Sequence, residues 1–369
     1  MTALRVGMIG CGAISGQYLA SFDRLASLGS DVTLVAVADL DADRAAAVAA
    51  DRDGVRALGV EELLAADDVD LVLNLTIPAA HAQIALDAIA AGKAVYGEKP
   101  LAATTADAQR VMAAAADAGV RVGCAPDTVL GTGIQTARRA VDDGLIGTPV
   151  AATAVMLTPG HERWHPNPDF YYQPGGGPLL DMGPYYVTAL VTLLGPVRSV
   201  TGRSSRARDE RTIGSGAREG ETIGVTVDTH VTGVLEHTSG ALSTLIMSFD
   251  AVATTQTAPI EVHGTAGSLA VPDPNRFDGT TSLFPLGGDG WQELPVSAGY
   301  RDSGRGYGIA DLAATPDPEE PRAGGALALH VLDVMESLLR SADEGRTITV
   351  DTTTERPPAV PLSDLPGQG

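Results

Sequence analysis

The sequence has very little cysteine and no long apolar run. Among its 369 residues only Cys11 and Cys124 carry thiols, which argues against a disulfide or zinc framework. Each lies at the end of an expected strand, where a thiol serves as a small buried apolar group. No run reaches the ~18 apolar residues of a transmembrane helix, and the first residues show no leader-like pattern. We therefore expect a soluble, cytoplasmic protein.

Positive charge is scarce as well. The chain carries 25 lysines and arginines against 46 aspartates and glutamates, a formal net charge of −21. Such a surface repels nucleic acid and anionic membranes, so we expect neither as a partner. The apolar content of 44% is that of a globular protein, and the length favours two domains. One local arginine cluster is diluted by acidic residues and is interpreted as a solvated loop; it contains Arg203, Arg206, Arg208 and Arg211.

The N-terminal stretch predicts a strand, a tight glycine turn and a helix. The apolar strand ends at Gly10, and helical spacing of apolar residues begins at Ile14. Gly10 permits the turn, and Gly12 lets the backbone approach a pyrophosphate. The N–H groups at the start of the helix, around Ala13 and Ile14, then face the phosphates. Ser15 replaces the third glycine of this dinucleotide-binding motif, so an ordinary glycine-rich turn is the alternative.

A second apolar strand, 33–38, ends at Asp39. At that distance from the glycines, an acidic residue accepts hydrogen bonds from the adenosine ribose and repels a 2′-phosphate. The pattern therefore predicts NAD as the cofactor and makes NADP less favourable. The alternative is that Asp39 only caps the next helix, 41–50.

The first third of the chain alternates strands and helices, which predicts a parallel sheet covered by helices. Pro78 stands at a helix start, a position that proline favours. Besides the segments above, the expected elements are strands 71–75, 94–96 and 120–124 and helices 78–90 and 105–118. We assign residues 1–126 to this first, NAD-binding domain and residues 127–369 to a second domain for substrate binding and oligomerisation.

The pattern changes in the second domain, where period-2 segments predict a largely antiparallel sheet. The expected hairpin pairs 225–231 with 242–248. Residues 287–321 are rich in glycine and proline and are expected to hold little regular structure, and the tail after Pro357 to be extended and poorly ordered. Further strands are expected at 259–263 and 267–271, and helices at 133–142 and 326–342.

Two stretches carry chemically useful side chains. Lys99 directly follows the fifth strand, and ligands of an open α/β sheet lie beyond the carboxyl ends of its strands. A surface lysine before a stiff turn is the alternative. Asp181 and Tyr185 follow a run of glycines and share a helix face; we expect Asp181 to cap that helix and Pro184 to lie in its first turn. A core helix with Tyr185 as packing is the alternative.

A loop with two histidines precedes the glycines. Trp164 beside His161 and His165 suits a sugar-binding loop, because aromatic faces stack on sugar rings, but an ordinary polar loop fits equally well. His161, Glu162 and His165 have metal-like spacing, yet nearby prolines oppose a regular helix, so no metal is expected. Among the later histidines, which we interpret as structural, His330 is a weak substrate candidate.

Together, the glycine turn, the Glu98-Lys99-Pro100 segment and the glycine run with Asp181 and Tyr185 resemble the Gfo/Idh/MocA family, which includes glucose–fructose oxidoreductase and myo-inositol dehydrogenase. The resemblance covers nearly the whole chain. It implies an α/β fold, with an N-terminal Rossmann domain followed by an α/β domain with a large, mostly antiparallel open sheet. It also implies NAD(P)-linked oxidation or reduction of sugars, polyols or cyclic alcohols, in homodimers or homotetramers built through that sheet.

The resemblance assigns roles residue by residue. Lys99 matches the catalytic lysine, Asp181 matches the family's aspartate, and Tyr185 stands where many members carry histidine and some carry tyrosine. The segment Ala125-Pro126-Asp127 departs from the Asn/Arg-bearing segment of many members, so no substrate contact is assigned there. The cofactor-contacting positions are matched by Thr76, Pro78 and His81 after the fourth strand, and by Glu98 beside Lys99.

The sequence thus predicts an NAD-dependent oxidoreductase acting on a secondary alcohol of a sugar or cyclitol, or on its ketone. Tyr185 would serve as the base, Lys99 would favour the ionised base and bind the substrate oxygen, and Asp181 would orient Lys99 or a substrate hydroxyl. Trp164 and His165 complete the expected substrate contacts. Two alternatives stay open: a glycosidase that uses NAD transiently, and a non-catalytic NAD-sensing protein, against which the retention of all three residues argues.

Overall fold

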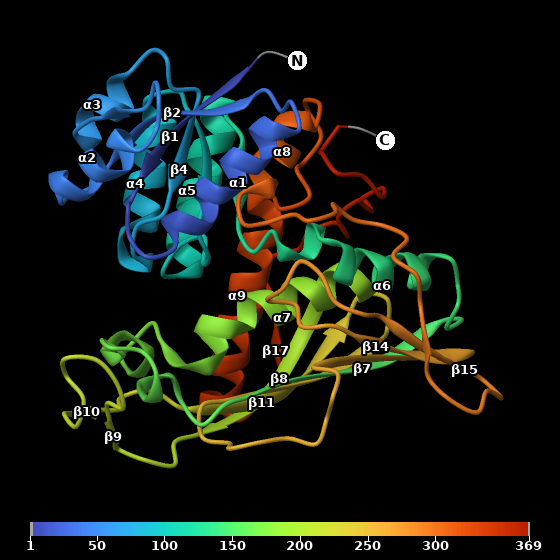
Figure 1. Cartoon of the computed structure of the whole chain (residues 1–369). Helices are drawn as coiled ribbons and strands as arrows, with labels where there is room; N and C mark the ends of the chain where they lie inside the picture. The colour runs from blue at the N-terminus through green and yellow to red at the C-terminus, as the bar shows by residue number, and fades with distance from the viewer. Residues whose placement is uncertain (1–2, 368–369) are drawn as a thin grey trace. The chain divides into compact units, whose positions relative to one another are not determined.

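The computed structural model describes residues 3–367 and divides the chain into two compact units (Figure 1). Unit 1 runs to Gln135 and also takes in Ser297–Leu329 and the segment from Pro357 on. Unit 2 contains Thr136–Val296 and His330–Arg356. The C-terminal part of the chain thus contributes to both units, which the order of strands and helices along the sequence does not indicate.

Unit 1 is built on a six-stranded sheet in the order β3-β2-β1-β4-β5-β6, with all neighbours parallel. The strand order reverses beside β1, and ligands of such sheets bind where that reversal opens a crevice at the carboxyl ends. This confirms the predicted Rossmann fold. The strands are β1 (Leu4–Ile9), β2 (Val32–Ala38), β3 (Arg56–Ala57), β4 (Leu71–Asn74), β5 (Ala94–Gly97) and β6 (Val122–Cys124). The helices between them are α1 (Ser15–Ser27), α2 (Ala42–Ala50), α3 (Val60–Ala65), α4 (Pro78–Ala90) and α5 (Thr105–Ala118).

The segment 297–329 adds helix α8, Tyr307–Ala314, to unit 1. This corrects the expectation that 287–321 holds little regular structure. The start of the helix is held by the buried residue Asp127, whose Oδ2 accepts the backbone N–H groups of Gly306 and Gly308 at 2.7 and 2.9 Å. Because Asp127 is remote in the sequence, the glycine- and proline-rich segment 287–321 does not by itself indicate a helix.

The described part of the tail is extended but packed, which corrects the expectation of poor order. Val360 and Leu365 are buried, and the Val360 N–H donates to Oε1 of Gln135 at 2.9 Å. Isolated bridges join Pro361 to Ala298 and Ser363 to Tyr300. The tail therefore completes unit 1.

Unit 2 is built on a nine-stranded sheet in the order β16-β15-β14-β13-β7-β12-β11-β8-β17, antiparallel except for β7 with β12. The predicted large, mostly antiparallel sheet is confirmed. The strands are β7 (Pro149–Leu157), β8 (Val197–Ser205), β11 (His230–His237), β12 (Leu242–Ser248), β13 (Ile260–Gly264), β14 (Gly267–Val271), β15 (Ser282–Pro285), β16 (Gln292–Glu293) and β17 (Ile348–Thr349), with β9 (Glu210–Thr212) and β10 (Thr222–Gly224) forming a separate arm. The helices are α6 (Thr132–Asp142), α7 (Gly177–Leu194) and α9 (Gly325–Glu344), of which α6 and α9 cross the unit boundary. Two short 3-10 helices, η2 (His161–Arg163) and η3 (Asp169–Tyr172), also lie in unit 2, whereas η1 (Thr128–Leu130) lies in unit 1.

One face of the large sheet is shaped for helices. Gly202 of β8 and Gly233 of β11 pair directly, and Leu338 of α9 fills the space that their missing side chains leave. A Cβ at either glycine would lie under 3 Å from Leu338. On the opposite face, Val234 and Thr244 pair across β11 and β12 and are exposed.

Three local expectations in unit 2 are corrected. The hairpin strand begins at His230 rather than residue 225, because Val225 and Thr226 donate backbone hydrogen bonds to Asp209 and Tyr172 instead. Helix α7 begins at Gly177 with proline in its first turn, so Asp181 is not its cap and Pro184 lies inside it. Arg211, placed by its sequence in a solvated loop, is buried and ion-paired.

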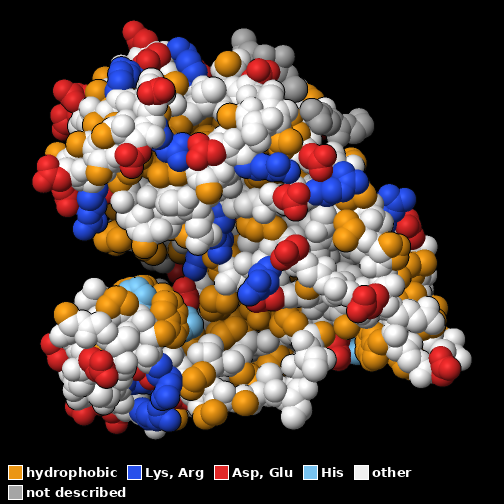
Figure 2. Space-filling view, in the orientation of Figure 1, with side chains coloured by type: hydrophobic (Ala, Val, Ile, Leu, Met, Phe, Trp, Pro, Cys, Tyr) orange, Lys and Arg blue, Asp and Glu red, His pale blue; other side chains and the backbone are white. Residues whose placement is uncertain are grey.

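The surface of the visible face carries interspersed acidic and basic side chains (Figure 2). None of the helices among residues 3–367 combines the length and apolar character needed to cross a bilayer.

Asp127 makes the stability of unit 1 depend on pH. Burial raises the pKa of its carboxyl to about 6, because the ionised form loses its water. The folded state therefore keeps this proton to a higher pH than the unfolded chain, and the group's stabilisation, full at low pH, is lost as the pH rises through about 6.

Replacing Asp127 with Asn removes this dependence while keeping an oxygen acceptor. As the pH falls from about 7.5 to about 5, the wild type should gain about 1 kcal/mol in free energy of unfolding relative to Asp127→Asn, because only the wild type takes up the proton. Urea unfolding of both proteins across this range measures the difference. A difference that stays constant with pH would contradict the account.

Candidate functional site

The turn after β1 is fixed by backbone crowding at Gly10. Gly10 has φ 103°, donates its N–H to the Ala38 carbonyl at 2.8 Å, and would place a Cβ 2.7 Å from the Leu75 carbonyl atoms. Gly12, in contrast, is exposed and has open space where a Cβ would point. Ser15 is buried and its hydroxyl donates to the Gly12 carbonyl at 2.7 Å, which explains why serine fits in place of the third glycine.

The start of α1 suits a pyrophosphate. Its N-cap residue, Ile14, provides no side-chain hydrogen bond, and no acidic residue lies in the first turn. A helix start leaves several backbone N–H groups without helical partners, and the helix dipole favours an anion there. Together with the open surface over Gly12, these residues fit the phosphates of a dinucleotide.

Asp39 ties the end of β2 to the glycine turn. Its Oδ2 accepts the Cys11 N–H at 2.7 Å, and its Oδ1 accepts the Asp41 N–H at 2.9 Å. The cap of α2 is Asp41, which accepts the Asp43 N–H, so the alternative role of Asp39 as that cap is not what the structure shows. Burial, with a smaller contribution from Asp39, raises the pKa of the Cys11 thiol to about 11, so the thiol stays protonated.

The loop after β4 is held by a buried asparagine and a buried histidine. Asn74 accepts from the Thr76 hydroxyl at 2.6 Å and donates to the His81 carbonyl at 3.1 Å. The His81 ring lies between the carbonyl oxygens of Thr76, at 3.0 Å, and Pro100, at 2.6 Å. His81 therefore joins the loops after β4 and β5 within unit 1, with Pro78 exposed at the start of α4.

The residues after β5 include one anchored carboxylate. Glu98 is buried; it accepts the Tyr18 hydroxyl at 2.8 Å and the Lys99 N–H at 3.0 Å. Burial, together with the charge of Glu98, raises the pKa of Tyr18 well above its usual value, so Tyr18 remains a donor. Lys99 is half-buried at the carboxyl end of the strand, where the sequence predicts it.

Sequence reasoning missed two exposed apolar residues beside the crevice. Leu40 is 100% exposed directly after Asp39, and Ile77 is 69% exposed directly after Thr76. They follow β2 and β4, the two neighbours of β1. Their signal in the sequence is a large apolar residue that closely follows a strand end, and such residues suit contact with a flat heterocyclic base.

In unit 2, α7 presents Asp181 and Tyr185 one turn apart, with Tyr185 buried. The structure adds a partner that the sequence did not indicate: Nε2 of His161 lies 3.1 Å from Oδ2 of Asp181. From the sequence, the His161 loop is a candidate only for a metal or a sugar. Within residues 3–367, no cluster of three His, Cys, Asp or Glu side chains is arranged for a metal ion.

The loop carrying Trp164 and His165 forms an aromatic cluster. Trp164 and Phe170 are exposed, and the His165 ring lies 5.4 Å from Trp164 and 5.5 Å from both Phe170 and Tyr171. His330, in contrast, is fully buried and accepts the Val197 N–H at 3.0 Å, and burial lowers its pKa to about 4, which makes it a structural residue.

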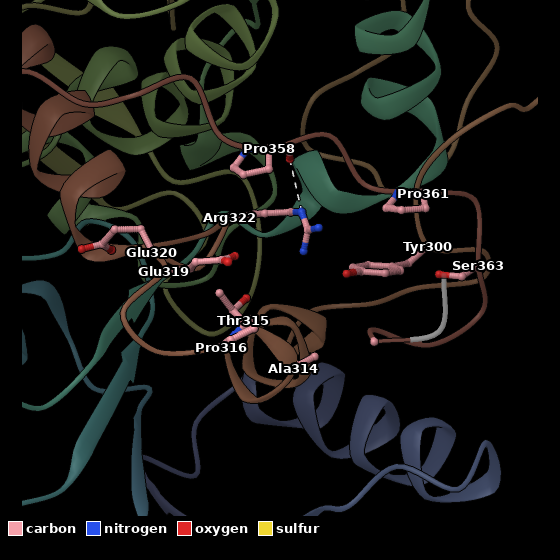
Figure 3. A pocket seen from close by; sticks show the side chains of 11 residues that line it. Tyr300, Ala314, Thr315, Pro316, Glu319, Glu320, Arg322, Pro358, Pro361 and Ser363 are labelled. Atoms are coloured by element: carbon pink, nitrogen blue, oxygen red, sulfur yellow. Dashed lines mark hydrogen bonds between the residues drawn. The ribbon is translucent and has the colours of Figure 1, made fainter. Parts of the chain in front are cut away.

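Two cavities have linings that include no residue of the glycine turn. One in unit 2, of about 360 Å³, is bordered by His161, Met182, Tyr186 and Asp273. One in unit 1, of about 200 Å³, is bordered by Tyr300, Glu319 and Arg322 (Figure 3). Arg322 is ion-paired with the fully buried Asp311 at 2.6 Å and donates to the Pro358 carbonyl at 3.2 Å, so it serves to join α8 to the tail.

The geometry at Asp39 predicts discrimination between nicotinamide cofactors. A carboxylate at this place repels a 2′-phosphate, and Arg44, the nearest cation along the chain, pairs with Asp41 at 3.2 Å. We expect NADH to bind at least about tenfold more tightly than NADPH. Asp39→Asn keeps an acceptor for the turn but removes the charge, so it should reduce this ratio, whereas Asp53→Asn, an exposed residue beyond the C-terminal end of α2, should not. Fluorescence titrations measure both cofactors; equal or tighter NADPH binding by the wild type would contradict the assignment.

Profiles of known families match most of the chain. One described as an oxidoreductase family with an NAD-binding Rossmann fold matches residues 4–125, and one described as the GFO/IDH/MocA C-terminal domain matches residues 134–270. The two matches fall on the parallel sheet of unit 1 and on the large sheet of unit 2.

Known proteins match over nearly the full length. The 1,5-anhydro-D-fructose reductase of Ensifer adhaerens is 33% identical over 359 residues, which cover 94% of this chain and 99% of that protein. The D-apiose dehydrogenase of Paraburkholderia graminis is 27% identical over 380 residues, covering 96% and 91%. The crystal structure of an NAD binding oxidoreductase from Klebsiella pneumoniae has a TM-score of 0.81 at 25% identity, covering 95% of this chain and 99% of that one. The chain therefore belongs to the Gfo/Idh/MocA family of NAD-dependent oxidoreductases.

Proposed function

We propose that the protein oxidises a secondary alcohol of a sugar or cyclitol, or reduces the corresponding ketone, with NAD(H). The observation that carries the proposal is the match to 1,5-anhydro-D-fructose reductase along nearly the whole of both chains. The relation to D-apiose dehydrogenase supports the same substrate class. Both names describe a redox change at a carbon of a carbohydrate.

The residues of unit 1 supply the cofactor's place. When NAD is bound, the open turn at Gly12 and the start of α1 would hold its pyrophosphate, and the carboxylate of Asp39 would accept from the ribose hydroxyls. Leu40 and Ile77 offer apolar contact to the base. NAD, when bound, supplies a hydride acceptor to the reaction.

We assign to Tyr185 the role of the base that accepts the proton of the reacting substrate hydroxyl. An unperturbed tyrosine ionises near pH ~10, too high for an effective base at neutral pH, so it needs a cation to favour its phenolate. We give that role, together with a hydrogen bond to the substrate oxygen, to Lys99, which matches the family's catalytic lysine. Asp181 holds a substrate hydroxyl or the lysine, and Trp164 and His165 contact the sugar ring. Lys99 belongs to unit 1 and the other four residues to unit 2.

A substrate panel with product analysis tests the function. NADH formation is measured with sugars, cyclitols and glycosides, and the products are identified. The proposal predicts one NADH for each ketone formed. Release of a free sugar from a glycoside without net NADH would instead identify a glycosidase that uses NAD transiently, and the absence of turnover with every compound would favour a sensing protein.

The role of Tyr185 predicts a specific kinetic pattern. Tyr185→Phe should lower kcat by about 10²-fold or more, because the proton acceptor is lost, while NAD affinity changes little. Lys99→Ala should be at least as damaging, and the two losses should not add, because the groups act as one unit.

His165 is the competing base, so the same kcat and pH profile are measured for His165→Ala. Near-full activity of Tyr185→Phe together with collapse of His165→Ala would move the assignment to His165.

We propose that the exposed face of the large sheet forms the contact of a homodimer or homotetramer. Val234 and Thr244 lie side by side on this face, and both side chains are uncharged and exposed. Val234→Lys should lower the assembled mass by placing a charge there, whereas Val252→Lys, in an exposed loop outside the strands, should not. Light scattering at micromolar concentration measures the mass. A wild-type mass equal to that of a monomer would contradict the proposal.

A further inference from the structure

We infer that His161 is a positioning residue for Asp181: its Nε2–H holds the carboxylate that α7 presents to the substrate. The inference rests on the proposed function only in giving Asp181 a substrate to meet. The hydrogen bond itself lies wholly within unit 2.

The geometry of the pair fixes the tautomer of His161. Nε2 lies 3.1 Å from Oδ2 of Asp181, with the two side chains only 12% and 18% exposed. An ionised carboxylate can only accept, so Nε2 must carry the proton. Nδ1 is buried and has no hydrogen-bond partner among the residues that the structure describes. No second hydrogen bond there competes for the ring, and the bond to Asp181 decides its orientation.

Three aromatic rings enclose the imidazole. The centroids of Phe249, Tyr171 and Trp164 lie 4.4, 4.7 and 5.2 Å from the centroid of His161. Such packing restricts rotation of the ring and leaves only a small part of the side chain exposed. A hydrogen bond to a carboxylate is stronger between such largely buried groups than in water.

The backbone under His161 is anchored by a buried ionic network. Glu162, the next residue, accepts from the Tyr172 hydroxyl and pairs with Arg211 at 3.0 Å. Arg211 also pairs with Asp250, and the Tyr172 hydroxyl in turn accepts the His161 N–H at 3.1 Å. Since breaking a buried ion pair leaves an uncompensated charge, this network resists movement of the turn.

The residue before the turn is adapted to the network. Gly160 has φ 116°, and a Cβ there would lie under 3 Å from the carboxylate of Glu162 and the guanidinium of Arg211. Only glycine meets both conditions. A glycine, a buried ion pair and three aromatic rings therefore together fix the orientation of one imidazole. That imidazole, in turn, contacts the one carboxylate to which we give a role at the substrate.

Kinetics of two replacements separate the hydrogen bond from packing. His161→Leu fills the aromatic enclosure without a donor and should lower kcat by about 10-fold or more, the scale of one hydrogen bond to a charged group. His161→Gln restores an N–H at a similar distance and should recover most of that loss. NADH affinity should stay within about twofold in both, because the cofactor is bound by unit 1.

Arg163→Gln is the matched control, since Arg163 is exposed in the same turn; its kinetics should equal those of the wild type. Leucine activity within about threefold of the wild type would overturn the inference. So would a glutamine variant as impaired as the leucine variant, because the donor would then not matter.

Nitrogen NMR tests the hydrogen bond without any substrate. In protein labelled with ¹⁵N-histidine, two-bond correlations report the tautomer of each ring, and the His161→Gln spectrum identifies the signals of His161. The Nε2–H tautomer is expected, and it should be lost or weakened in Asp181→Ala. A neutral Nδ1–H tautomer would overturn the inference. If no compound of the panel reacts while the Nε2–H tautomer is observed, the proposed function fails and the positioning of Asp181 stands.

Discussion

The backbone at the carboxyl end of β4 leaves no room for a side chain at Gly10, and the arrangement of the turn after β1 in unit 1 depends on this close contact. A Cβ at Gly10 would collide with the backbone of Leu75, so the chain must turn there with a positive φ. The turn brings the N-terminus of α1 to the edge where the strand order reverses. Asp39 then fastens the turn through the Cys11 N–H. One constraint on backbone packing thereby shapes the turn to which we assign the pyrophosphate and places the carboxylate to which we assign the ribose.

In unit 2, the main structural feature is the way polar side chains are held in fixed positions over the large sheet. Two facing glycines accept Leu338, and α7 lies over β7, β11 and β12 with Asp181 near its start. Buried charges are costly unless each is paired, and the Glu162–Arg211–Asp250 network satisfies that condition. We regard its purpose as specificity of geometry rather than stability, since it fixes the turn that carries His161.

The sequence predicted the parts whose signal is local. Strands buried on both faces, the glycine turn, Asp39 and the helix starts at Pro78 and Thr105 follow from short patterns and appear in the structure. Long-range contacts decided the rest. Residues 225–229 alternate like a strand but bond to Tyr172 and Asp209, α8 depends on Asp127, and Arg211 has its partners 49 and 39 residues away. The His161–Asp181 pair spans 20 residues, so no local pattern could reveal it.

The central claim is that hydride moves between a carbohydrate carbon and NAD, and isotope transfer measures it directly. A substrate carrying deuterium at the carbon of the reacting hydroxyl is incubated with the enzyme and NAD, and the reduced cofactor is analysed by mass spectrometry and NMR. The account predicts one deuterium at C4 of the nicotinamide for each ketone formed. A reduced cofactor without the label, or a label found only in a sugar released from a glycoside, would contradict it.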